Sequence, residues 1–346
     1  MSSNKGDVKV GLAFSCTQPI EHYVNCTKPA LRYGFDMIQV YDDLPFRPTW
    51  PIVFTLAPLM RTSRSRTSIG AGVVVPYLIH PGLIATNLAC LEEESGQRAF
   101  LVLGRGAFHE LFDTKAPHPI TGLREAVEII DNLFAGKRLN YQGKVFSQTE
   151  HAQFRWKSTK KRRRHIPIYL GTWGPKTAQM AGRLKNVSGI IVGAIVEPNY
   201  IHMLRENIDI GAREASRMEV VDCGVCPSTI ISNNRDNAFK KARNATAVYL
   251  PSFGNLTDHV GVSSEEVEGV RDAIAKGDMK LAYNLVSEKT IDAFTMWGTP
   301  EDIIGKTERL GQAGVTRINF ALGWGPEDLD DIRLIGKKIL PHFKKR

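Results

Sequence analysis

The feature that most constrains this chain is a regular alternation of short apolar segments with amphipathic segments, which runs almost from end to end. The apolar segments have the length and composition of buried strands, and the segments between them carry hydrophobic residues at helical spacing. The eight predicted strands are residues 8–14, 37–41, 68–75, 99–103, 166–170, 187–192, 220–231 and 316–322. This order predicts parallel strands joined by right-handed helical crossovers.

The segments between the strands predict the helices and one hairpin. The predicted helices are residues 21–33, 51–60, 81–95, 122–133, 175–183, 198–216, 235–249, 263–286, 299–311 and 326–340, with a break near Gly277. Residues 140–146 predict a small hairpin with Gln142 and Gly143 at its centre.

Eight strand–helix units in 346 residues fit an α/β fold of the closed (β/α)8 type, a TIM barrel with insertions. We expect one domain over residues 1–346, with insertion segments near 140–165 and 250–295, because no linker divides the chain. An open doubly wound sheet is the alternative. Such a sheet usually carries a G-x-G-x-x-G fingerprint after its first strand, and residues 13–17 contain no glycine.

The turn after the fifth predicted strand is the strongest candidate binding site. It contains Gly171, Thr172, Trp173, Gly174 and Lys176, and a helical pattern begins directly after Gly174. Free backbone N–H groups and the positive end of the helix dipole suit a phosphate, and the glycines allow close approach of the backbone. The alternative is a tight strand–helix turn that binds no ligand.

Charge and hydropathy limit the classes of partner. The net charge is +9, and much of the excess lies in the basic run at residues 157–165. Such a run occurs in nucleic-acid contacts and address signals, but no aromatic platform or helix-turn-helix pattern accompanies it. We expect a solvated loop or an attraction for an acidic ligand, and no nucleic-acid partner. No apolar run is long enough to span a membrane and no secretory signal is visible, so we expect a cytoplasmic protein.

The cysteines and other reactive residues exclude several kinds of chemistry. Five irregularly spaced cysteines do not form a disulfide framework, and the single pair Cys223-x-x-Cys226 favours buried thiols over a metal or redox half-site. No metal is expected, because no cluster of ligands falls at the strand ends. Neither a nucleophile elbow nor a P-loop is present. We therefore expect a bound organic cofactor to supply the reactive centre.

Catalytic residues of a TIM barrel lie at the carboxyl ends of its strands. Asp42 and Asp43 follow the second predicted strand and point to opposite sides if that end is extended. One would face the barrel mouth as a base or as an acceptor from a cofactor ring, and the other would cap or pair. The alternative is a turn with two solvated carboxylates.

The fourth predicted strand ends in a second candidate group. Gly104 and Gly106 follow it, with His109 and Glu110 shortly after them. A histidine and a carboxylate at a strand end can carry out acid–base work. A histidine satisfied by the backbone at a helix start is the equally open alternative.

Several motifs in order resemble the luciferase-like monooxygenase superfamily. They are Pro19-Ile-Glu, Tyr41-Asp-Asp, Gly70-Ala-Gly-Val with Pro76 and His80-Pro, the segment 91–106 ending Leu-Gly-Arg-Gly, Tyr169-Leu-Gly-Thr-Trp-Gly-Pro-Lys-Thr with Ala181-Gly, and Gly298-Thr-Pro-Glu-Asp with Gly314-Val. The resemblance extends from about residue 8 to residue 340. Within the superfamily the chain is most similar to the coenzyme F420-dependent oxidoreductase branch, notably the methylenetetrahydromethanopterin reductases.

This resemblance implies a bacterial luciferase-like TIM barrel with the deazaflavin coenzyme F420 in its mouth and hydride transfer at C5. It implies that Asp42 contacts the ring. It implies a strand bulge with a non-prolyl cis peptide at Gly72–Val73, continuing to Val74, behind the ring. It assigns the turn at residues 171–176 to the phosphate tail, with Gly193 and Ala194 as a second contact to the tail, and it implies a homodimer or higher homo-oligomer.

Three positions depart from that family pattern. Ala13 stands where the reductases have an acidic residue on the first strand, Asp43 where they usually have a histidine, and Ala107 where an acidic residue often follows the Gly-x-Gly. These are proton-handling positions, so we expect Asp43, His109 and Glu110 to act as substitutes.

The sequence thus predicts an F420-dependent oxidoreductase that transfers hydride between the deazaflavin C5 and a small organic substrate, similar to methylenetetrahydromethanopterin reductase. An FMN-dependent luciferase-like monooxygenase is the first alternative. A non-catalytic barrel that binds a ligand or nucleic acid is the second, and the three departures are its support.

Overall fold

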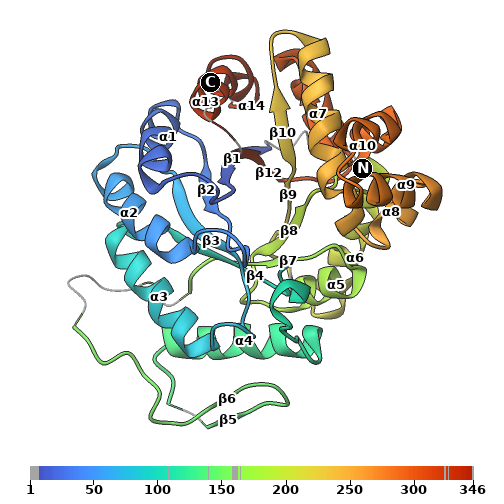
Figure 1. The fold of residues 1–346 in the computed structure, drawn as a ribbon. Coiled ribbons are helices and arrows are strands. Elements are labelled where there is room, and N and C mark those ends of the chain that lie inside the picture. The colour runs from blue at the N-terminus through green and yellow to red at the C-terminus, as the bar shows by residue number, and fades with distance from the viewer. Residues whose placement is uncertain are drawn as a thin grey trace.

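The computed structural model describes residues 8–107, 109–138, 140–157, 163, 165–322, 325 and 327–344, and only the backbone of Glu110. Its centre is a closed barrel of eight parallel strands with helices packed around it (Figure 1). The barrel strands are β1 (Lys9–Phe14), β2 (Met37–Val40), β3 (Ser68–Val74), β4 (Ala99–Gly104), β7 (Ile168–Gly171), β8 (Gly189–Gly193), β9 (Asp222–Cys226) and β12 (Arg317–Leu322). The prediction of a TIM barrel is confirmed, and the open sheet is excluded because β12 pairs with β1 over six residue pairs.

The predicted helices follow the strands in the expected order, and the short helices at residues 256–259 and 288–294 were not predicted. The helices are α1 (Ile20–Tyr33), α2 (Thr49–Thr62), α3 (Pro81–Glu94), α4 (Pro119–Phe134), α5 (Pro175–Arg183), α6 (Pro198–Glu214), α7 (Arg235–Tyr249), α8 (Leu256–His259), α9 (Ser264–Ala275), α10 (Met279–Leu285), α11 (Glu288–Phe294), α12 (Pro300–Gln312), α13 (Asp328–Leu334) and α14 (Leu340–Phe343). Side-chain caps set several starts, as at α12, where Thr299 and Asp302 form a capping box. The break near Gly277 separates α9 from α10, as predicted.

Two apolar layers hold the barrel together. The larger layer lies between the strands and the surrounding helices. A smaller cluster fills the barrel interior with residues such as Phe100, Val102 and Tyr169. At the end where the strands begin, the Arg317 guanidinium lies 3.1 Å from the Asp222 carboxylate. These side chains fill the barrel below its mouth, so the opposite end is left for a ligand.

The prediction of one strand over residues 220–231 is wrong. Pro227 divides this segment into β9 and β10 (Ser228–Ile231). Proline cannot donate a ladder hydrogen bond, and beyond it β10 pairs with β12 at Ser228 and Ala321 and with β11 (Thr295–Gly298) over four residue pairs. The strand β11 was not predicted, because its four residues follow α11 without a turn signal.

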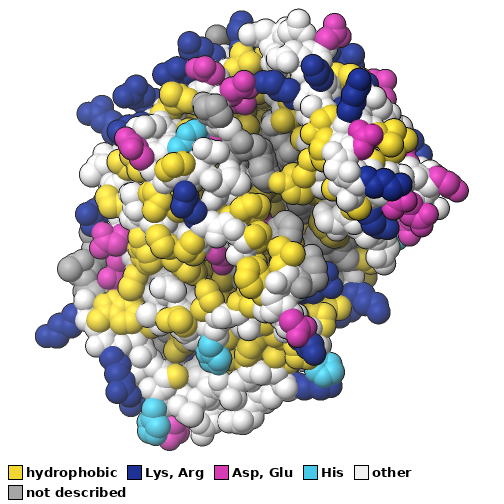
Figure 2. Space-filling view, viewed as in Figure 1, with side chains coloured by type: hydrophobic (Ala, Val, Ile, Leu, Met, Phe, Trp, Pro, Cys, Tyr) yellow, Lys and Arg dark blue, Asp and Glu magenta, His cyan; other side chains and the backbone are white. Residues whose placement is uncertain are grey.

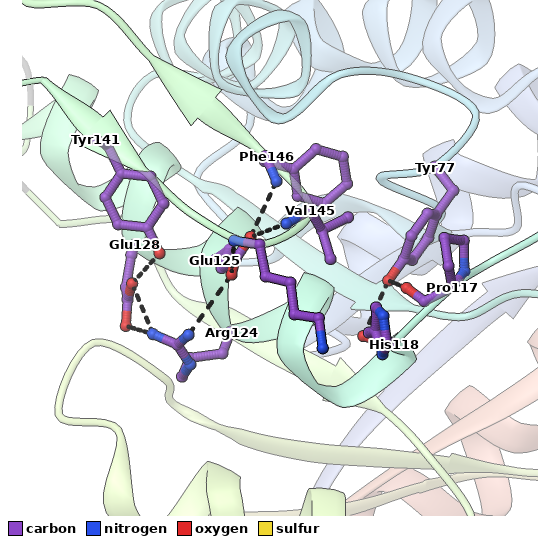
Figure 3. Close-up of polar contacts among 10 residues, drawn as sticks. Tyr77, Pro117, His118, Arg124, Glu125, Glu128, Tyr141, Val145 and Phe146 are labelled. Atoms are coloured by element: carbon purple, nitrogen blue, oxygen red, sulfur yellow. Dashed lines mark hydrogen bonds and ion pairs between the residues drawn. The ribbon is translucent and has the colours of Figure 1, made fainter.

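The hairpin in the predicted insertion exists, but its predicted centre is wrong. Its strands are β5 (Tyr141–Gln142) and β6 (Ser147–Gln148), so residues 143–146 form the turn. Figure 1 shows this hairpin projecting beyond α4. The reason for the displaced turn is the Glu125 carboxylate of α4, which accepts backbone N–H groups of Lys144, Val145 and Phe146 at 2.8–2.9 Å (Figure 3).

The environment of Glu125 determines its charge state. Burial alone would raise the pKa of its carboxyl, but the three N–H groups and Arg124 outweigh burial and hold that pKa below its usual value. Beside it, Arg124 pairs with Glu128, and Glu128 accepts from the Tyr141 hydroxyl. An ionised, fully hydrogen-bonded carboxylate therefore fixes the insertion to the barrel.

Most of the basic run lies outside the described residues, which include only Lys157, Arg163 and His165 of it. Arg163 donates to the buried Glu92 carboxylate and to the Ala99 carbonyl oxygen at 3.1 Å. The Arg163 guanidinium therefore has a structural role, because it is paired with a buried carboxylate. Within the described part of the chain, no helix has both the length and the apolar composition needed to cross a bilayer.

Candidate active site

A cavity of about 810 Å³ opens at the carboxyl ends of the barrel strands. In the view of Figure 2, the molecule is hollowed between the side over α1–α3 and the side over α7–α10, and hydrophobic side chains border the hollow. The predicted site residues that line the cavity are Asp43, Gly72, Val73, Gly106, His109, Gly171, Thr172, Trp173, Gly193 and Ala194. The structure therefore brings predicted residues from the ends of five strands, β2, β3, β4, β7 and β8, into one cavity.

The peptide bond between Gly72 and Val73 is cis, as the family resemblance predicts. The buried Gln39 side chain donates to the Gly72 carbonyl oxygen at 3.0 Å. The Asn319 amide in turn donates to Gln39 Oε1 at 3.1 Å. Two buried amides below the cavity therefore hold the backbone of this bulge in place.

The glycines on this side of the cavity allow the strands to pack closely around Val73. A Cβ atom added to Gly104 would lie 2.4 Å from Val73 Cγ1, and one added to Gly171 would lie 2.7 Å from Cγ2. Gly104 thus packs against Val73, which lines the cavity, and is not itself a lining residue. Val74 is fully buried in the layer between strands and helices, because the chain turns its side chain away from the mouth.

The two adjacent aspartates separate as the alternation of side chains predicts. The Asp42 carboxylate accepts from the Thr49 backbone N–H at 3.2 Å, at the start of α2, and Asp42 does not line the cavity. Asp43 does line it, and no described residue donates a hydrogen bond to its carboxylate. The structure therefore gives Asp42 the capping position and Asp43 the position facing a ligand.

Burial sets the protonation of both aspartates. Burial, together with a smaller effect of the neighbouring Asp42 charge, raises the pKa of Asp43 from 3.8 to about 6. Burial also raises the pKa of Asp42 to about 6, against the effect of the Thr49 N–H. An unpartnered carboxyl that titrates close to neutral pH is suited to accept or donate a proton.

Three further titratable groups lie near Asp43. The Tyr41 hydroxyl is 3.2 Å from Cys226 Sγ, and Tyr249 of α7 lies on the same cavity. Burial raises the pKa of Cys226 and that of Tyr249 to about 12, and the Asp43 charge adds to both shifts. These groups stay neutral at physiological pH. Cys223 and Cys226 are both buried, as expected, although Cys226 also lines the site.

His109 lines the cavity, but its ring is already bonded within its loop. Nε2 lies 2.5 Å from the Arg105 carbonyl oxygen and Nδ1 lies 2.6 Å from the Thr114 hydroxyl. A carbonyl oxygen only accepts, so Nε2 carries the proton and Nδ1 accepts from Thr114. This arrangement orders the loop after β4. The side chain of Glu110 lies outside the described residues.

The predicted phosphate turn is a strand–helix junction, as expected. The Thr172 hydroxyl accepts from the Gly174 N–H at 2.9 Å, and no side chain of the described residues caps α5. Trp173 Nε1 donates to the Gly193 carbonyl oxygen at 2.8 Å, and the Tyr200 hydroxyl donates to the Trp173 carbonyl oxygen at 2.6 Å. Lys176 is exposed on α5 and does not line the cavity.

The opposite side of the cavity was not predicted from the sequence. Its residues are Ser228, Ala245, Thr246, Tyr249, Ser252, Phe253, Phe294 and Thr295. Phe253 stacks on Phe294 with ring centroids 4.5 Å apart, and the Thr246 and Thr295 hydroxyls are 2.8 Å apart. Ser228 starts β10, within the predicted strand 220–231, and the others come from the end of α7, the segment after it, the end of α11 and the start of β11. Across the described residues, no group of three or more His, Cys, Asp or Glu could hold a metal ion.

Known proteins resemble this chain over most of its length. A family model described as luciferase-like monooxygenase matches residues 4–317. The 5,10-methylenetetrahydromethanopterin reductase of Archaeoglobus fulgidus is 32% identical over 333 residues, covering 94% of this chain and 96% of the relative. The F420-dependent glucose-6-phosphate dehydrogenase of Microbacterium testaceum is 28% identical over 325 residues, 90% of each chain. The solved coenzyme F420-dependent tetrahydromethanopterin reductase of Methanopyrus kandleri has a TM-score of 0.85 at 26% identity, over 98% of this chain and 100% of that one.

Proposed function

Because this chain belongs to the luciferase-like monooxygenase family, we propose that it is a coenzyme F420-dependent oxidoreductase that transfers hydride to or from a small organic substrate. The observation that carries the proposal is the likeness, over nine-tenths of the chain, to relatives and a solved structure that are named as F420-dependent enzymes or as methylenetetrahydromethanopterin reductases. We take reduction or oxidation at a single substrate carbon, as in the reductases, to be the reaction class.

The cavity residues fit such a cofactor. A Cβ added to Gly193 would lie more than 4 Å from the atoms of the other described residues, its chain neighbours apart, so the backbone there leaves open space on the cavity side. The uncapped start of α5 offers backbone N–H groups to a phosphate. The cis bulge at Gly72–Val73 would support the ring, and residues 171–174 with Gly193 and Ala194 would hold the tail. When bound, the deazaflavin supplies a hydride donor or acceptor at C5.

The protein's own contribution is a proton position and a binding surface for the substrate. Asp43 would accept the proton of a substrate hydroxyl in one direction or return it in the other, since its carboxyl titrates near neutral pH and has no competing partner among the described residues. His109 and Arg105 would order the loop after β4 that closes this side of the cavity. Phe253 and Phe294 would exclude water from the reacting centre.

We extend the proposal to assembly and location. Exposed hydrophobic side chains, Leu83 and Ile120 at the starts of α3 and α4 and Phe112 between them in the chain, support a homo-oligomer. Cys16, Cys26, Cys223 and Cys226 are buried thiols, which supports a reducing compartment such as the cytoplasm. Light scattering on the purified protein tests the assembly, and a monomer at micromolar concentration would contradict it.

Titration of the purified protein with F420 and, separately, with FMN tests the cofactor, followed by fluorescence. We expect F420 to bind at micromolar or lower concentration and FMN to bind more weakly. Preferential binding of FMN would overturn the proposal in favour of an FMN-dependent monooxygenase. If neither F420 nor FMN bound, the hypothesis of a flavin- or deazaflavin-dependent enzyme would fail, and a barrel that binds another ligand would remain.

A further inference from the structure

A second cavity, of about 710 Å³, lies outside the barrel against the start of α6 and beside α8, α11 and α12. A thin wall separates it from the first cavity. Ala194 and Phe294 line the first cavity, whereas Val196, two residues after Ala194, and Ala293, the residue before Phe294, line the second. The Val196 backbone N–H donates to the Ala293 carbonyl oxygen at 2.8 Å. The proposed reaction makes no use of this second space.

Cations from several elements converge on the second cavity. Lys289 comes from α11, and Lys306 and Arg309 lie three residues apart on one face of α12. His259, at the end of α8, is also part of the lining. Two successive helices therefore place three positive charges, Lys289, Lys306 and Arg309, around one concave space.

The two carboxylates of this cavity are already engaged. Glu197 caps α6 by accepting from the Tyr200 N–H at 2.7 Å, and it also accepts from the Asn199 amide at 3.1 Å. Asp292 accepts from Trp297 Nε1 at 2.8 Å and from Lys306 Nζ at 2.9 Å. Within the described part of the chain, no carboxylate pairs with the other two cations.

Those two cations are held at the cavity without a counter-charge. Lys289 Nζ donates to the Gly261 carbonyl oxygen at 2.7 Å, which fixes the ammonium beside α8 without neutralising it. Arg309 is exposed and close enough to Lys306 to act on its charge. Burial lowers the pKa of Lys306 and the Arg309 charge lowers it further, in opposition to Asp292. Like charges gathered in this way are relieved by an anion placed between them.

We propose that this second cavity binds a small organic anion with two or more negative charges, carried on phosphate or carboxylate groups and held by Lys289, Lys306 and Arg309. Its volume is that of a site for a small molecule. Lysine and arginine donors match the oxygens of either group, and arginine can contact two of them at once. The shared chemistry is a compact polyanion, and the choice between phosphate and carboxylate is left to the measurement.

The test is calorimetric titration of the full chain with pyrophosphate and, separately, with citrate, at constant ionic strength. We expect one molecule to bind per chain with at least one of the two probes. The double variant Lys289→Gln/Arg309→Gln should weaken binding at least tenfold. The matched control Lys280→Gln/Arg271→Gln removes the same charge from exposed positions on α10 and α9 and should change binding less than twofold.

Three results would overturn the proposal. They are absence of binding for both probes, an equal loss in the two double variants, and an unchanged affinity in the Lys289/Arg309 variant. Equal loss would mean that only the net charge attracts the anion. The thermal midpoint of each variant is measured first, and the single variant Arg309→Gln, expected to lose at least threefold, replaces the double variant if the latter does not fold.

Discussion

The two sides of the main cavity are built in different ways. The side formed by β3, β4, β7 and β8 is rich in glycine: a Cβ at residue 72, 104 or 171 would clash with the neighbouring strand, and Gly193 borders open space. The side formed by α7 and β11 consists of side chains, with Tyr249, Phe253 and Thr295 among them. A backbone surface can hold a flat group common to many enzymes, whereas side chains can change from one enzyme to the next. We infer that the first side binds the cofactor and the second selects the substrate.

Asp43 lies between these two sides and belongs to neither. It is the only acidic residue among the described residues that line the cavity. If the division between a cofactor side and a substrate side holds, changes at Asp43 should affect the chemical step, and changes on either side should affect one kind of binding.

The largest effect is expected from Asp43→Asn. Loss of the proton acceptor or donor should lower kcat by about 10²- to 10⁴-fold. The wild-type rate should depend on a group with a pKa of about 6. In the direction where Asp43 accepts a proton, the rate should fall as the pH drops through 6, and in the reverse direction it should fall as the pH rises through 6.

Asp42→Asn is the matched control, because Asp42 caps α2 and does not line the cavity. We expect a loss of less than about tenfold there, since only positioning changes. Steady-state rates across pH 5–8 decide between the two. A larger loss for Asp42→Asn would contradict the assignment of the chemical step to Asp43 and would fit the ring contact that the family resemblance implies for Asp42.

The next largest effect concerns the glycine side. In Gly104→Ala the new Cβ would lie 2.4 Å from Val73 Cγ1 and 2.9 Å from the Gly171 carbonyl oxygen, so a strand must shift. Such overpacking costs about 1–3 kcal/mol, which we expect as a lower thermal midpoint and an F420 affinity reduced by tenfold or more. Fluorescence titration and thermal unfolding measure the two effects.

Gly193→Ala separates packing from binding on the same side. Within the part of the chain that the structure describes, its Cβ would meet no atom within 4 Å beyond its chain neighbours, so the thermal midpoint of the free protein should be unchanged. The methyl group would project toward the cavity, so F420 should still bind more weakly. If F420 affinity were unchanged in Gly193→Ala, the backbone side would not be the cofactor side.

The sequence predicted the backbone side far better than the side-chain side, and the reason is physical. Glycines at strand ends are visible in one sequence because a close approach excludes a side chain, and the cis bond at Gly72–Val73 followed from the position of that bulge in the family. Tyr249 and Phe253 carry no such mark. They belong to a helix end and the segment after it, and that helix, α7, follows β10, which lies between β12 and β11 in the sheet.

The direction in which a single side chain points was the second feature that the sequence could not predict. The sequence showed that Asp42 and Asp43 point to opposite sides, but not which one faces the mouth. The Thr49 N–H at the start of α2 decides this by binding Asp42. For His109 both the acid–base and the structural reading were open, and the positions of Arg105 and Thr114 show a ring that is hydrogen-bonded at both nitrogens.

A smaller effect should separate the two sides directly. Tyr249→Phe removes a hydroxyl from the side-chain side, so we expect KM for the substrate to rise by about fivefold to tenfold, the value of one hydrogen bond. F420 affinity should change less than twofold. Tyr200→Phe is the matched control, because its hydroxyl holds the Trp173 carbonyl oxygen on the backbone side.

The reverse pattern is expected for Tyr200→Phe, with weaker F420 binding and an unchanged substrate KM once F420 is saturating. Steady-state kinetics with each ligand varied in turn give both constants. If both variants changed the same constant, the two sides would not act separately.

The smallest expected effect compares two buried carboxylates whose environments are opposite. The Asp43 pKa is raised from 3.8 to about 6, so the folded state holds its proton more tightly and this contribution to stability falls as the pH rises from about 4 to 6. A shift of two units corresponds to at most about 3 kcal/mol, and solvent in the cavity reduces it, so Asp43→Asn should stabilise the protein by about 1 kcal/mol at pH 8 and by less at pH 5. The backbone hydrogen bonds of Glu125 lower the pKa of its carboxyl, so the ionised carboxylate stabilises the folded state at neutral pH, and this stabilisation is lost as the pH falls. Glu125→Gln should therefore destabilise the protein at pH 8 and destabilise it less at pH 5. Urea unfolding at the two pH values measures both differences. If Asp43→Asn were destabilising at pH 8, Asp43 would be a structural carboxylate like Glu125, and its assignment to the chemical step would fail.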